Sequence, residues 1–152
     1  ADSVHLTLFP ETPADWRDDA HAARWAKIFK VRRVVTGALE VERREKRIGS
    51  SLEAAPDVYI TEKSLIDAYK GEDAADLFIT SQAVLKTGDG PAGAFTLDDV
   101  EGVAVVPGKA NGVKCARSWK YFDPKTALKG FPDLTPRDAA AVEAWDAGQG
   151  AV

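Results

Sequence analysis

The residues of this 152-residue chain that are best suited to chemistry form two groups of cations. The first is the run Arg43-Arg44-Glu45-Lys46-Arg47. The second is Lys114-Cys115-Ala116-Arg117-Ser118-Trp119-Lys120-Tyr121, in which cations are interleaved with two aromatic residues. Guanidinium and ammonium groups bind phosphate oxygens, and aromatic rings stack on unpaired bases. Both groups therefore predict contact with a nucleic acid that has single-stranded parts.

Each group also has an explanation that involves no ligand. A basic run at the end of a helix is commonly solvated, with Glu40–Arg44 and Glu42–Lys46 pairs and cations close to the terminal carbonyls. The second group is equally typical of a β-rich segment with two partly buried aromatic residues. Arg32 falls by helical phase on an apolar stripe, where we expect it to pair with a carboxylate.

Patterns for catalysis or metal binding are absent from the sequence. His5 and His21 are the only histidines and Cys115 is the only cysteine, and their spacing supports neither a Cys/His pair nor a metal site. The glycines form neither a Walker loop nor a GxGxxG motif. We therefore expect no catalytic residue and no cofactor in this chain.

The composition is that of a globular protein, with 45% hydrophobic and 29% charged residues. The net charge of −4 argues against a generally basic coat, but residues 24–47 hold nine basic and three acidic residues. We therefore expect the chain to contact a polyanion through local basic groups and not through its whole surface. No stretch approaches the roughly 20 apolar residues of a membrane helix. The single cysteine suits a reducing compartment, so we expect a cytoplasmic protein, and the lack of methionine leads us to expect a fragment.

A long helix is expected to carry the first basic group. Acidic residues at its start and basic residues at its end predict a helix from residue 18 or 19 to about residue 47. Its apolar residues form two rows, Trp25, Ile28, Phe29, Val35 and Leu39 in one and Val31, Val34, Ala38 and Val41 in the other. A helix that is apolar on two sides belongs inside a bundle, so we expect partner helices on both sides.

The remaining segments predict smaller elements. We expect an extended lead-in at 3–9, strands at 58–60 and 103–106, strand-forming sequence at 77–85, a helix over 62–70 capped by Thr61, and a final helix from Thr135 to about residue 147. The fold class is therefore α+β. A bundle-type helix with its lead-in occupies residues 1–50, a small mixed α/β subdomain residues 51–108, and a tail with a C-terminal helix residues 109–152.

Five stretches resemble class I isoleucyl-tRNA synthetases of the bacterial type, in order and at plausible spacing. They are Ser3-Val4-His5-Leu6 with Phe9-Pro10, Trp25 to Glu40, Arg44 to Ala54, Leu77-Phe78-Ile79-Thr80-Ser81-Gln82, and the group from Lys114 to Tyr121. The run that ends in Leu52-Glu53-Ala54, together with the Lys-Cys-x-Arg segment, indicates the isoleucine enzyme over the valine enzyme.

The resemblance implies that the long helix ends the anticodon-binding domain and that the chain holds tRNA(Ile). The HIGH and KMSKS motifs are absent, so isoleucine and ATP with Mg²⁺ would be handled by the parent enzyme. The implied partners are tRNA(Ile) and the remaining synthetase domains, with no DNA and no membrane. The implied tRNA-binding residues are Arg33, Arg43, Arg44, Lys46, Arg47, Lys114, Arg117, Trp119, Lys120 and Tyr121.

Many members of that family carry a zinc knuckle of two Cys-x-x-Cys pairs in this tail. Here the pairs read Cys115-x-x-Ser118 and Thr135-x-x-Asp138. Three of four thiolates are missing, and a serine hydroxyl is a poor zinc ligand at neutral pH. We therefore expect no zinc, and we expect the helix that begins at Thr135 to hold the tail together.

Two other functions remain open from the sequence. The chain is alternatively a docking module that stabilises the synthetase without touching RNA. It is alternatively a free-standing RNA-binding paralogue.

Overall fold

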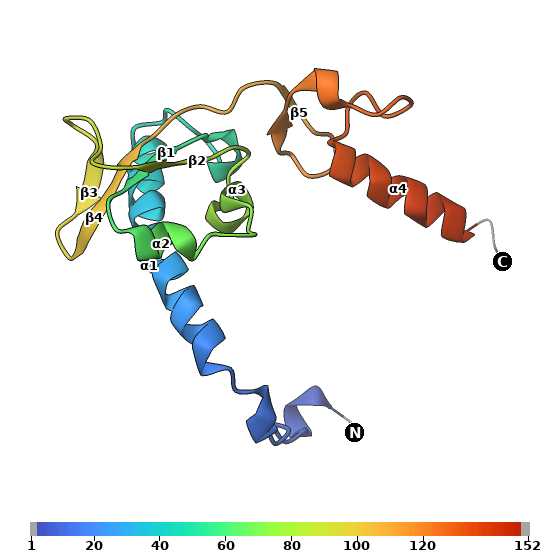
Figure 1. Ribbon diagram of the computed structural model, residues 1–152. Helices are drawn as coiled ribbons and strands as arrows, with labels where there is room; N and C mark the ends of the chain where they lie inside the picture. The colour runs from blue at the N-terminus through green and yellow to red at the C-terminus, as the bar shows by residue number, and fades with distance from the viewer. Residues whose placement is uncertain (1–2, 150–152) are drawn as a thin grey trace.

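A 26-residue helix, α1 (Asp19–Arg44), crosses one face of a small sheet in the computed structural model, which describes residues 3–149 (Figure 1). Residues 1–2 of the predicted region 1–50 and residues 150–152 of the predicted region 109–152 lie outside the described residues. The Asp18 carboxylate accepts the backbone N–H of His21 at 2.8 Å, which confirms the predicted start. The helix ends three residues before the expected position because Lys46 adopts φ 56°, a left-handed conformation that reverses the chain.

The sheet has four strands in the order β2-β1-β4-β3. These are β1 (Asp57–Ile60), β2 (Val84–Thr87), β3 (Phe95–Leu97) and β4 (Val100–Val106). β1 and β2 are parallel, while β4 is antiparallel to both β1 and β3. A parallel pair needs a crossover, and two short helices, α2 (Lys63–Asp67) and α3 (Ala74–Phe78), provide it. The predicted strand at 58–60 is confirmed, and the one at 103–106 begins three residues earlier.

One hydrophobic core joins α1 to the sheet and to the short helices. Both apolar rows of α1 contribute to it, and its members on α1 are Ile28, Val31, Val34, Val35, Ala38 and Leu39. Alternate residues of β1 and β4 face the same core, namely Val58, Ile60, Val103 and Val105. The partner of α1 within the described chain is therefore this sheet with its short helices, where the sequence led us to expect bundle helices.

Polar side chains of α1 also hold the short helices. The Arg24 Nε donates to the carbonyl of Ala68 at the end of α2, and the Arg32 Nε donates to the carbonyl of Leu77 in α3, both at 2.8 Å. Arg32 thus caps a helix with its guanidinium, where we expected a carboxylate partner. In return the Tyr69 hydroxyl donates to the carbonyl of Ile28 at 3.0 Å, and burial raises the pKa of that phenol.

The strand expected over residues 77–85 is the largest local error. Residues 74–78 are helical because the Asp73 carboxylate accepts the backbone N–H of Ala75 at 2.8 Å and Phe78 packs against the ring of Tyr69. Ile79 then adopts φ 58° and ends the helix, so that β2 starts only at residue 84. Tertiary packing overrides the strand propensity of this segment.

The predicted helix over 62–70 also differs. The helical part covers only residues 63–67, and its N-cap is Glu62. The expected cap, Thr61, lies at the end of β1, and its hydroxyl donates to the carbonyl of Gly102 at 3.4 Å. The Thr61 hydroxyl therefore bonds to the neighbouring strand β4 and does not cap the helix.

The tail consists of a two-stranded hairpin and a helix. The strands are β5 (Val113–Lys114) and β6 (Tyr121–Phe122), and the helix is α4 (Pro136–Gln149). The backbone N–H of Asp138 donates to the Thr135 hydroxyl at 3.1 Å, which confirms Thr135 as the cap. Figure 1 shows α4 extending away from the sheet, and its buried residue Ala139 lies in the first turns.

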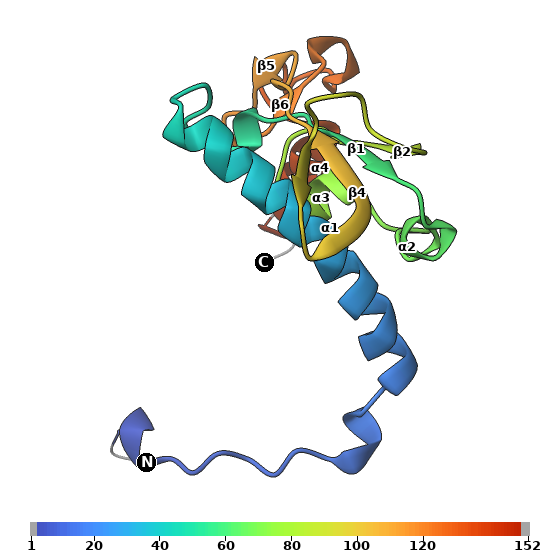
Figure 2. The same ribbon diagram turned by 90° about the vertical axis from the view of Figure 1, so that its left-hand side faces the viewer.

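The N-terminal arm, residues 3–18, extends away from the sheet beyond the start of α1 (Figure 2). It contains two 3₁₀ turns, Val4–Leu6 and Ala14–Trp16, in place of a uniformly extended segment. Its apolar side chains are exposed, and Phe9 is 100% exposed.

Among the residues that the structure describes, none of the helices is long and apolar enough to cross a membrane.

Candidate nucleic-acid interface

The three arginines of the basic run lie at the end of α1 and pair with glutamates of the same segment. The pairs are Arg43 with Glu40, Arg44 with Glu45, and Arg47 with Glu42. The Arg47 guanidinium donates to both carboxylate oxygens of Glu42, at 2.7 and 2.8 Å. The exposed pairs of Arg43 and Arg44 contribute about 0–1 kcal/mol each, so a phosphate can replace the carboxylate there, although the glutamates reduce the positive potential.

Lys46 differs from these arginines, because no ion pair is found for it within residues 3–149. A second lysine, Lys109, lies nearby on the segment that leaves β4. The backbone N–H of Ala110 donates to the carbonyl of Glu53 at 2.8 Å, which holds this segment beside the turn that follows α1. The hydrogen bonds from Arg47 lower the pKa of Glu42 against the effect of burial, and the charges of Arg47 and Lys109 lower it further.

Lys109 was not among the predicted site residues. Its position at the helix end depends on where β4 leaves the sheet, which local sequence does not show.

Arg33 does not belong to the helix-end group. Its guanidinium pairs with Asp99, in the turn between β3 and β4. Arg33 precedes Arg43 by ten residues, which corresponds to about 15 Å along a helix axis. The structure therefore does not bring Arg33 together with the basic run.

The hairpin presents one aromatic ring to solvent. Its loop, residues 115–120, is closed by a hydrogen bond from the Cys115 N–H to the Lys120 carbonyl at 2.8 Å. Trp119 adopts φ 63° in this loop and is 61% exposed. The Lys114 Nζ lies 5.1 Å from the centre of the Trp119 ring, which is a cation–π contact. This pair offers an aromatic face and a positive charge at the same place.

The other predicted hairpin residues have different surroundings. Lys120 pairs with Asp76 of α3, and the backbone N–H of Tyr121 donates to the Ser81 hydroxyl at 2.6 Å. These two residues attach the hairpin to the rest of the chain. Arg117 is exposed, with its Nε 3.8 Å from the Asp138 carboxylate. Lys114, Arg117 and Trp119 are thus the predicted hairpin residues that face outward.

Three side chains behind the hairpin loop converge on one carboxylate oxygen of a fourth, Asp138. The Asp138 Oδ2 accepts hydrogen bonds from the Cys115 thiol at 3.2 Å, the Ser118 hydroxyl at 2.5 Å and the Thr135 hydroxyl at 2.7 Å. Burial raises the pKa of Asp138, but these three hydrogen bonds and the charge of Arg117 outweigh it, so the pKa is lowered overall. Within residues 3–149, no group of three or more His, Cys, Asp or Glu side chains is arranged to hold a metal ion.

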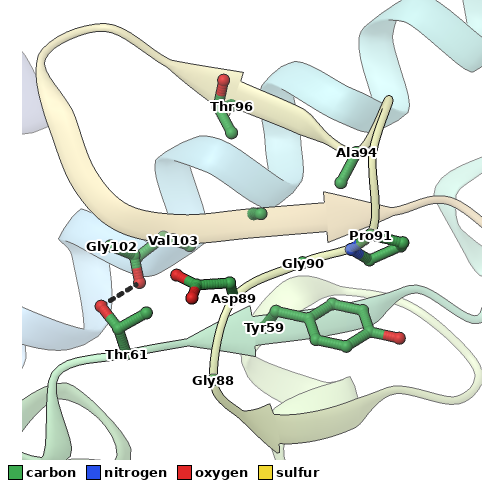
Figure 3. A pocket seen from close by; sticks show the side chains of 11 residues that line it. Tyr59, Thr61, Gly88, Asp89, Gly90, Pro91, Ala94, Thr96, Gly102 and Val103 are labelled. Atoms are coloured by element: carbon green, nitrogen blue, oxygen red, sulfur yellow. Dashed lines mark hydrogen bonds between the residues drawn. The ribbon is translucent and has the colours of Figure 1, made fainter.

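An open hollow of about 250 Å³ lies on the sheet face opposite to α1, between the strands and the loop 88–94 (Figure 3). Tyr59 and Ala104 form its floor, and the loop glycines approach closely, since a Cβ on Gly90 would lie 2.7 Å from that of Ala104. Asp89 is the one ionisable carboxylate in the described lining, which contains no histidine, cysteine or lysine.

Comparison with known proteins gives close relatives for most of the chain. It is 57% identical over 140 residues to the isoleucine–tRNA ligase of Brucella abortus biovar 1 (strain 9-941), 55% identical over 150 residues to that of Caulobacter vibrioides, and 54% identical over 142 residues to that of Agrobacterium fabrum. These alignments cover 92, 99 and 93% of this chain. No family model matches the chain.

The similarity puts the chain in the class of aminoacyl-tRNA synthetase segments. In particular, it is a homologue of a C-terminal segment of the isoleucine–tRNA ligases. The chain spans only 14–15% of the length of the relatives it matches.

Proposed function

We propose that this chain is the tRNA-binding C-terminal portion of an isoleucine–tRNA ligase. In this role it positions tRNA(Ile) while the catalytic domain of the parent enzyme, which uses ATP and Mg²⁺, attaches isoleucine in the cytoplasm. The observation that carries the proposal is the exposed Trp119 ring with the Lys114 ammonium beside it, on a segment homologous to tRNA ligases. An unpaired base stacks on such a ring while the phosphate meets the cation.

The helix end supplies the second contact in this proposal. Lys46 and Lys109 are exposed lysines for which no ion pair is found among the described residues, and the three neighbouring arginines exchange their glutamate partners for phosphates. Phosphate contacts position a nucleic acid and release counterions, so binding through them weakens as salt rises. The hairpin would contact an unpaired loop, and the helix end would contact the adjoining backbone.

Removal of the ring in Trp119→Ala tests the hairpin. Stacking contributes about 1–3 kcal/mol per base, so the affinity for a tRNA(Ile) transcript should fall roughly 5- to 150-fold. The measurement is a titration with the full-length protein that contains this chain. The matched control is Trp145→Ala, because Trp145 is 67% exposed and lies on α4, away from the hairpin. Equal affinity of wild type and Trp119→Ala would overturn the hairpin contact.

The docking alternative is favoured by one observation, namely that each arginine of the basic run already has a glutamate partner. The triple variant Arg43→Ala/Arg44→Ala/Arg47→Ala separates the two functions. If the run binds phosphates, the salt dependence of tRNA binding becomes shallower by about one phosphate per lost contact. Arg17→Ala is the matched control, because Arg17 is likewise exposed and paired, with Asp19. An unchanged salt dependence assigns the run to docking.

A free-standing RNA-binding paralogue is the third possibility. The full reading frame distinguishes it, because a catalytic domain in the same frame excludes it.

A further inference from the structure

The Asp138-centred cluster joins two segments at matching spacing. Cys115 and Ser118 are three residues apart in the hairpin loop, and Thr135 and Asp138 are three residues apart at the start of α4. The first three side chains donate hydrogen bonds to a single atom, Asp138 Oδ2, at 2.5–3.2 Å. Cys115 is fully buried, and the Asp138 side chain is only 15% exposed. The cluster is thus the buried connection between the hairpin and α4.

The zinc knuckle implied by the family resemblance does not fit these residues. A structural zinc site needs four thiolate or imidazole ligands, whereas this cluster has one thiol, two hydroxyls and one carboxylate. The thiol and both hydroxyls use their protons to bond the carboxylate, so they act here as donors. The carboxylate oxygen lies between the other three groups, at the place where a metal ion would have to be.

We propose that the Asp138 carboxylate takes the structural place of a metal ion, so that the tail folds around a hydrogen-bonded centre while its backbone keeps the arrangement of a four-ligand site. The hydrogen bonds to the carboxylate stabilise the cluster. A carboxylate that accepts several hydrogen bonds forms strong, charge-assisted contacts, and Arg117 nearby balances its charge.

The position of Asp138 in α4 adds to this effect. Its backbone N–H donates to the Thr135 hydroxyl, and that hydroxyl donates back to its carboxylate. This is a reciprocal cap at the helix start, where a negative charge is also favoured by the helix dipole. One carboxylate therefore orients the Thr135 hydroxyl that caps α4 and also fastens the helix to the hairpin.

The first experiment uses the full-length protein with its natural sequence. The total zinc content of the full-length protein would include zinc bound outside this segment. The readout is therefore hydrogen exchange of the α4 amides with and without a chelator. We expect the same protection in both conditions. Loss of α4 protection on chelation would show that a metal holds the tail and would overturn the proposal.

The second experiment tests the carboxylate directly. Asp138→Asn keeps the shape of the side chain but removes its charge, so α4 amides should exchange at least tenfold faster. Asp146→Asn on the same helix is the matched control, since Asp146 is exposed and outside the cluster. Equal exchange in Asp138→Asn and wild type would overturn the role of the carboxylate.

The third experiment tests the retained geometry. The triple variant Ser118→Cys/Thr135→Cys/Asp138→Cys should bind one additional Co²⁺ relative to wild type and show an intense thiolate-to-cobalt absorption band. Addition of Cys115→Ser to the triple variant removes one thiolate and should weaken Co²⁺ binding at least tenfold. A triple variant that takes up no Co²⁺ beyond wild type would overturn the claim that the backbone keeps a four-ligand arrangement.

Discussion

The pair of hydrogen bonds between Arg47 and Glu42 closes the end of α1. The Arg47 contact lowers the pKa of Glu42, so the pair stabilises the fold above the ordinary pKa of about 4.5 and loses that effect as pH falls through the lowered value. We predict that Arg47→Ala shifts the pKa of Glu42 upward. Side-chain carbon chemical shifts recorded across the acid range measure it. Lys63→Ala, on the opposite part of the chain, is expected to leave the Glu42 titration unchanged, and an unchanged titration in Arg47→Ala contradicts the pairing.

Trp119 holds its ring outward at a backbone cost. A residue with a side chain at φ 63° pays about 1–2 kcal/mol that glycine avoids. We predict that Trp119→Gly is more stable than Trp119→Ala by about 1 kcal/mol, although both lack the ring. Thermal unfolding of the two variants measures the difference. Equal stability would mean that the loop relaxes when the ring is removed.

At the scale of elements, α1 organises its neighbours through arginine caps as well as through apolar packing. We predict that Arg32→Ala lowers the free energy of unfolding by about 1–3 kcal/mol, because the Leu77 carbonyl loses its donor. The adjacent Arg33→Ala removes only an exposed pair with Asp99 and should cost at most about 1 kcal/mol. Urea denaturation compares them, and equal losses would count against a capping role for Arg32.

Sequence patterns predicted those elements whose signals are local. The start of α1 at Asp18, the strand β1 and the start of α4 at Thr135 were predicted because capping residues and alternation act within a few residues. The helix α3 was missed because the strand formers from Phe78 onward extended the expected strand over residues 77 and 78, whereas the Asp73 cap and the packing of Phe78 against Tyr69 make these residues helical.

The candidate site was predictable in part for the same reason. Lys114 and Trp119 are neighbours across one hairpin, so their residue types and spacing were enough to place both in one candidate site. The attachment of Lys120 to Asp76, the arrival of Lys109 beside Glu42 and the isolation of Arg33 depend on contacts between distant segments. Only the folded chain shows these contacts.

At the scale of the whole molecule, the N-terminal arm carries apolar side chains that residues 3–149 leave exposed. Phe9 is fully exposed, and Leu8 is nearly so. Such a cluster is typical of a docking surface, and we expect it to contact the remaining domains of the proposed parent ligase. We predict that Phe9→Asp lowers the melting temperature of the full-length protein by a few degrees. Glu11→Ala in the same arm should not, and an unchanged melting temperature in Phe9→Asp contradicts docking of the arm.

The Asp138-centred cluster also bears on how the protein depends on its surroundings. Under the proposal made above, a tail fastened by oxygen atoms needs no supply of a trace element to reach its shape. In a cell starved of zinc, newly made chains would complete this region at the usual rate. Peroxide would find one sheltered thiol there in place of four.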